Sequence, residues 1–99
     1  MKKNIKTEAV SQFYRAVLAL KDEKECALFF EDLCTANELL SLSQRLEVGV
    51  RLIDGQTYQE ISKATGASTA TISRVNRLLS DDEDGIEMAA GRIKCTCSN

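Results

Sequence analysis

The segment from Thr57 to Leu79 constrains the fold most, because it carries the start and stop signals of two helices in close succession. Thr57 and Glu60 match a capping box, in which each side chain satisfies a free backbone amide where a helix begins. Gly66 predicts the end of that helix, and Ser68 predicts the cap of a second helix. The spacing predicts two short helices joined by a sharp turn, the layout of a helix-turn-helix.

The same segment has an apolar side. Ile61 and Ala64 are expected to face inward from the first helix, and Ile72 and Val75 are expected to anchor the second helix on the first. Both pairs have helical spacing, so the two predicted helices have a common buried face.

The rest of the chain also has helical periodicity. Apolar residues at spacings of three and four from Val10 predict one amphipathic helix, and residues 23–33 predict another. Thr35 and Glu38 form a further capping box, followed by a helical stretch to Gly55 with an expected break at residues 41–43. Residues 86–94 have weak helical potential, and residues 95–99 are expected to be a frayed tail.

Composition supports an all-α fold. The chain has 99 residues with no proline, and 43% of it is hydrophobic although only 5% is aromatic. No strand pattern, internal repeat or interdomain linker is found. We therefore predict a single domain over residues 1–99, with a dimerisation core at about 8–54, the helix-turn-helix at about 57–79, and an acidic segment with a short tail at 80–99.

The outward face of the second predicted helix is short and polar, with two arginines. Small side chains let a helix enter the major groove, where Thr and Ala methyl groups contact thymine methyls and Arg reaches base edges or phosphates. The predicted DNA-binding residues are Gln59, Ser68, Thr69, Ala70, Thr71, Ser73, Arg74 and Arg77. The alternative interpretation is an ordinary helical hairpin in which Gly66 is only a cap.

The net charge of −2 is unevenly distributed. Five acidic residues between positions 81 and 87 carry −5, so the remaining chain carries +3. DNA responds to the local charge that faces it rather than to the total, and this distribution is compatible with double-stranded DNA as a partner. The acidic residues are interpreted as a solvated helix exit, with a reduction of nonspecific DNA binding as a further hypothesis.

Other classes of function have little support. The chain has no histidine and no motif of paired carboxylates, nucleophile elbow or phosphate loop, so an enzyme is not predicted. The four cysteines (Cys26, Cys34, Cys95 and Cys97) lack the spacing of a zinc site, and neither a metal nor a cofactor is predicted. No signal peptide or apolar stretch long enough to span a membrane is found, which predicts a cytoplasmic protein without disulfides.

Residues 67–74, which follow Gly66, resemble the DNA-reading segment of the Trp repressor superfamily. Leu33-Cys34-Thr35, Gln44-Arg45-Leu46 and Asp54-Gly55 fall in the same register, with one residue fewer between Gly55 and Ile61. The resemblance covers about residues 33–79, and the pattern is most similar to the YerC/YecD-type branch. It implies an intertwined all-helical homodimer with two projecting reading heads.

The resemblance also implies an effector pocket. Thr35, Arg45 and Arg74 match the threonine and the two arginines that hold tryptophan in the tryptophan-binding repressors. Val75 and Leu78 stand where those proteins have a glycine and a serine, a difference that removes both space and a polar contact. We therefore expect Val75 and Leu78 to fill the pocket, and whether any small-molecule effector binds stays open.

The predicted function is that of a homodimeric, sequence-specific transcriptional regulator, expected to be a repressor that acts without tryptophan. Two alternatives remain: a helical dimerisation or protein-interaction module with a vestigial helix-turn-helix, and a tryptophan-responsive repressor. The operator, the regulated genes and the direction of control are not predicted.

Overall fold

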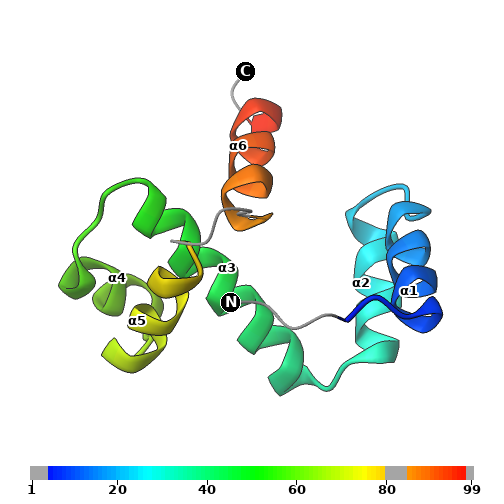
Figure 1. Cartoon of the computed structure of the whole chain (residues 1–99), viewed down its shortest axis with the longest axis horizontal. Helices are drawn as coiled ribbons and strands as arrows, with labels where there is room; N and C mark the ends of the chain where they lie inside the picture. Colours follow the sequence, from blue (N-terminus) through cyan, green and yellow to red (C-terminus); the bar gives the residue numbers. More distant parts are fainter. Residues whose placement is uncertain (1–4, 80–84, 98–99) are drawn as a thin grey trace. The chain divides into compact units, whose positions relative to one another are not determined.

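A computed structural model describes residues 5–79 and 85–97, with side chains to residue 93 (Figure 1). The described residues form helices and connecting turns and contain no strand, as predicted. The helices are α1 (Glu8–Leu18), α2 (Glu23–Leu33), α3 (Ala36–Ile53), α4 (Tyr58–Thr65), α5 (Thr69–Leu78) and α6 (Gly85–Cys97). None of these helices is both long and apolar enough to cross a membrane.

The chain divides into two compact units, residues 1–39 and 40–99, with the boundary inside α3. The predicted organisation placed its boundary later, between residues 54 and 57. The assignment of residues 8–54 to a single dimerisation core stays a prediction.

The first unit contains the hairpin of α1 and α2. Each helix begins at a side-chain cap: Thr7 Oγ1 accepts from the Val10 amide, and Asp22 Oδ1 accepts from the Glu25 amide. The Phe13 ring lies 6.1 Å from the Phe29 ring, so the two helices contact each other through aromatic side chains. No residue of α1 or α2 is fully buried within the chain.

Helix α3 is continuous over its 18 residues, so the break expected at residues 41–43 is wrong. A serine within a helix costs only about a few tenths of a kcal/mol relative to alanine. Neither glycine nor proline occurs at residues 41–43 to interrupt the helix. The start of α3 was predicted correctly: Glu38 N–H donates to Thr35 Oγ1, and Thr35 N–H donates to Glu38 Oε1.

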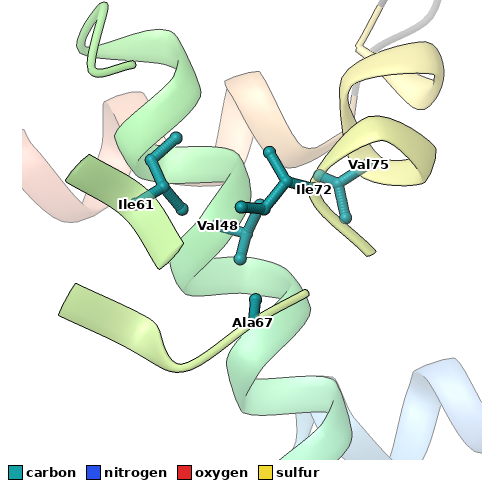
Figure 2. Packing of buried hydrophobic residues seen from close by; sticks show 5 residues of the cluster. All are labelled: Val48, Ile61, Ala67, Ile72 and Val75. Carbon is teal, nitrogen blue, oxygen red and sulfur yellow. The ribbon is translucent and has the colours of Figure 1, made fainter. Parts of the chain in front are cut away.

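The core of the second unit lies between α3, α4 and α5 (Figure 2). It consists of Val48 from α3, Ile61 from α4, Ala67 from the turn, and Ile72 and Val75 from α5. Burying each of the four larger side chains contributes about 1.5–3 kcal/mol relative to leaving it in water. Four of the five residues belong to the α4-turn-α5 segment, so the core holds this segment on α3.

One inward-facing prediction in α4 is wrong. Ile61 is fully buried, but Ala64 is exposed. The buried and half-buried residues of α4 are Tyr58, Ile61, Ser62 and Thr65, and position 64 lies beside the stripe that they form.

Helix α6 is longer than the sequence predicted, because it includes residues 95–97. Within the second unit, Ile86 of α6 packs against the core, and Ala90 of α6 is buried. A Cβ atom at Gly49 of α3 would lie 2.7 Å from Ile86 Cγ2, so the glycine allows this close approach. The acidic residues at positions 81–84 lie outside the described residues.

Candidate nucleic-acid interface

The turn between α4 and α5 is fixed by local hydrogen bonds. Gly66 ends α4 with φ 77° and ψ 3°, a left-handed conformation that residues with a side chain rarely adopt. Thr65 Oγ1 donates to the Ile61 carbonyl at 2.8 Å and accepts from the Ala67 amide at 3.1 Å. One hydroxyl therefore joins the last turn of α4 to the residue that enters the core.

Both helices of the motif begin at the predicted caps. The Thr57 side chain accepts from the Glu60 amide, and the Glu60 carboxylate accepts from the Thr57 amide, which completes the capping box. Ser68 Oγ accepts from the Thr71 amide at 3.1 Å. The start of α5 is thus set by the sequence immediately before it.

Two contacts from α3 were not predicted. Gln44 Nε2 donates to the Thr65 carbonyl at 3.3 Å, which joins α3 to the turn. The Arg51 guanidinium donates to Glu47 and to Gln56, the residue next to the cap of α4. The Gln44 contact has no local signal in the sequence because its partner lies 21 residues further along the chain, whereas Arg51 and Gln56 are only five residues apart.

The structure places most of the predicted DNA-binding residues on the surface. Ile72 and Val75 occupy the inner side of α5, as predicted, and are fully buried. Thr71 and Ser73 are half-buried. The exposed members of the predicted set are Gln59 on α4, Ser68 at the cap of α5, and Thr69, Ala70, Arg74 and Arg77 on α5.

This segment is positively charged. From Ile61 to Leu79 the sequence contains Lys63, Arg74 and Arg77 but neither Asp nor Glu. All three cationic side chains are exposed. With Glu60 at the start of α4 also counted, the three cations and one acid of the α4-turn-α5 segment give a net charge of +2, which favours an anionic partner.

The predicted effector residues have different environments. Thr35 caps α3 in the first unit. Arg45 is exposed and donates to Ser41 Oγ at 3.5 Å, while Arg74 is exposed on α5. Their assignment to an effector pocket stays a prediction.

Val75 and Leu78 differ in burial. Val75 is fully buried, and its Cγ1 lies 3.6 Å from the position of a Cβ atom at Gly49. Leu78 is 39% exposed. Val75 therefore fills space between α5 and α3, whereas Leu78 lies partly at the surface.

Within the described part of the chain, no three His, Cys, Asp or Glu residues are grouped to hold a metal ion. Cys26 and Cys34 are free thiols. The side chains of Cys95 and Cys97 lie outside the described residues.

Comparison with known proteins assigns the chain to a family. Residues 8–94 match the Trp repressor protein family. The YerC protein of Bacillus subtilis strain 168 is 51% identical over 92 residues, which cover 93% of this chain and 88% of that protein.

Two solved structures are similar over most of their length. A TrpR-like protein from Eubacterium eligens ATCC 27750 is 54% identical with a TM-score of 0.86, covering 90% of this chain and 92% of that one. A proposed Trp repressor from Staphylococcus aureus is 44% identical with a TM-score of 0.86, covering 91% and 90%. The resemblance noted in the sequence is confirmed: the chain belongs to the Trp repressor protein family and has a TrpR-like, all-helical fold.

Proposed function

We propose that this protein is a sequence-specific, double-stranded DNA-binding transcriptional regulator, and that it acts as a repressor. The observation that carries the proposal is the division of α5 into two sides. Ile72 and Val75 fix one side in the core, while Thr69, Ala70 and the two arginines are exposed on the other. Such a helix offers small groups for base edges and cations for phosphates. Membership of a family named for a repressor supports the same function.

The proposed regulator is a homodimer. Tyr14, Leu18, Leu28 and Leu33 of α1 and α2 are each more than half exposed in the single chain. Exposed apolar side chains in this number favour an interface, and a second copy would complete the core that α1 and α2 lack. A two-fold dimer places its reading helices about 34 Å apart, one turn of DNA, and so favours a pseudo-palindromic site.

We further propose that DNA binding does not require tryptophan. Val75 supports this part of the proposal because its side chain already fills space between α5 and α3. A ligand on the inner side of α5, between α5 and α3, would have to displace this fully buried residue. The proposed location is the cytoplasm, where a regulator of this kind has access to DNA.

In vitro selection from a random pool of DNA duplexes tests this function. Purified protein, with and without L-tryptophan, is expected to enrich the same pseudo-palindromic sequence. Enrichment that depends on L-tryptophan would contradict the tryptophan-independent mechanism. If no sequence is enriched under either condition, the DNA-binding function is wrong.

A protein-interaction module is the second candidate function, and the exposed apolar side chains of α1 and α2 favour it. The two functions differ in what they require of α5. An interaction module that uses α1 and α2 tolerates an acidic residue at the exposed Thr69, whereas a DNA reader does not.

A further inference from the structure

Helix α3 carries a polar side chain on the face that packs against the α4-turn-α5 segment. Gln44 precedes Val48 by four residues, so the two side chains lie on one face of α3. Val48 is buried in the same core as Ala67, a residue of the turn (Figure 2). Gln44 is half-buried, and its Nε2 donates to the Thr65 carbonyl at 3.3 Å. The face that supplies Val48 to the core therefore also supplies a hydrogen-bond donor to the turn.

The acceptor of this bond is a backbone group at the end of a helix. Thr65 is the last residue of α4, and the final carbonyls of a helix have no intrahelical amide as a partner. Gly66 leaves the helix with its left-handed backbone, and its amide donates to the Ser62 carbonyl. The Gln44 amide therefore gives the Thr65 carbonyl a donor from a different helix.

From Thr65 the hydrogen bonds continue towards the start of α5. The Thr65 hydroxyl accepts from the Ala67 amide at 3.1 Å. Ala67 is buried, and the next residue, Ser68, is the N-cap whose hydroxyl accepts from the Thr71 amide. These contacts connect the Gln44 amide to the first turn of α5.

We propose that Gln44 is a positioning residue, which fixes the turn on α3 and thereby sets the position of α5. The inference rests on the proposed DNA-binding function. Apolar packing in the core is not directional, whereas a hydrogen bond constrains both a distance and an angle. A binding surface must be held to within about 0.5 Å by supporting contacts of this kind. Gln44 acts through the turn and needs no contact with DNA.

Gln44→Met tests this role, because methionine is similar in length but has no N–H group to donate. Binding of a selected duplex is measured at a temperature at which circular dichroism shows that every variant is folded. Gln44→Met is expected to weaken this binding about 2–10-fold, the range that corresponds to the loss of one hydrogen bond. Gln12→Met makes the same change at an exposed position of α1 and should leave the affinity unchanged.

A rescue variant separates the hydrogen bond from the rest of the side chain. Lysine has a similar reach, and its ammonium group can donate to the Thr65 carbonyl. An added positive charge strengthens DNA binding by itself, so the comparison is with Ser43→Lys, which adds the same charge at the neighbouring exposed position. Gln44→Lys should bind the selected duplex as tightly as Ser43→Lys. Weaker binding by Gln44→Lys would contradict the role of the donor.

Amide hydrogen exchange without DNA distinguishes positioning from a general contribution to stability. In Gln44→Met the amides of Ala67 and Thr71 are expected to exchange faster than in the wild type. The Ile61 amide, which donates to the Thr57 carbonyl within α4, should keep its wild-type rate. An equal increase at all three amides, or wild-type rates at all three, would overturn the proposal.

The two measurements also separate this inference from the proposed function. A wild type that selects no DNA sequence would reject the sequence-specific regulator, and the exchange rates alone would then decide whether Gln44 fixes the turn. A wild type that prefers one sequence, together with a Gln44→Met variant of equal affinity, would retain the regulator and reject the positioning role.

Discussion

At the residue scale, the burial of Val75 agrees with its predicted inward orientation. The sequence predicted an inward-facing valine on α5, and the structure places it in the core with Val48, Ile61 and Ile72. Helical spacing was sufficient for this prediction because Val75 and Ile72 are three residues apart. Ala64 shows the limit of spacing alone: it is also three residues from a buried position, Ile61, and yet is exposed.

Replacing Val75 with alanine is expected to lower the free energy of unfolding by about 2 kcal/mol, because two buried methyl groups are lost and a cavity remains. Leu78→Ala removes a larger but partly exposed side chain and should cost less than Val75→Ala. Urea denaturation followed by circular dichroism measures both. Equal losses in the two variants would contradict the assignment of Val75 to the core.

At the element scale, the boundaries of α4 and α5 were predictable because they depend on capping residues that are adjacent in the sequence. Thr57, Glu60 and Ser68 make the expected caps, and Gly66 has the expected left-handed conformation. The hydrogen bond from α3 to the turn was not predictable, because Gln44 donates to a carbonyl that is 21 residues away in the sequence. The break predicted at residues 41–43 was wrong, because serine disfavours a helix much less than glycine or proline does.

The conformation of Gly66 yields a test at this scale. Gly66→Ala is expected to cost about 1–2 kcal/mol, because a Cβ atom is unfavourable at φ 77° although no neighbouring atom blocks it. Gly66→Asn should cost less, since asparagine tolerates left-handed backbone better than alanine. Thermal unfolding of both variants checks the order. If alanine is tolerated as well as asparagine, the turn does not depend on the left-handed residue.

At the scale of the whole molecule, a single chain leaves much apolar surface uncovered on its first unit. Leu18 is 82% exposed and Leu28 is 62% exposed. Local sequence patterns predicted α1 and α2 as helices, but the identity of what covers them is a property of the assembly. The resemblance to the Trp repressor family supplied the expectation of an intertwined homodimer, which stays a prediction.

Sedimentation equilibrium tests this expectation. The wild type is expected to have the mass of two chains at micromolar concentration. Leu18→Lys combined with Leu28→Lys should shift the protein towards one chain, because each change would bury a charge at the interface. Gln59→Lys combined with Ala64→Lys, which adds two lysines at exposed positions of α4, is the control and should remain dimeric. A wild-type protein with the mass of one chain would reject the homodimer.

The preference of α5 for one DNA sequence distinguishes a sequence-specific regulator from a protein-interaction module. Fluorescence anisotropy without tryptophan should show that the wild type binds a selected duplex about 10³-fold or more tightly than a scrambled duplex. Thr69→Glu places a negative charge at an exposed position of α5 and should abolish this preference with the fold intact, whereas Gln12→Glu on α1 should retain it. A wild type without preference, or a Thr69→Glu variant that keeps the wild-type preference, would contradict sequence-specific DNA binding by α5.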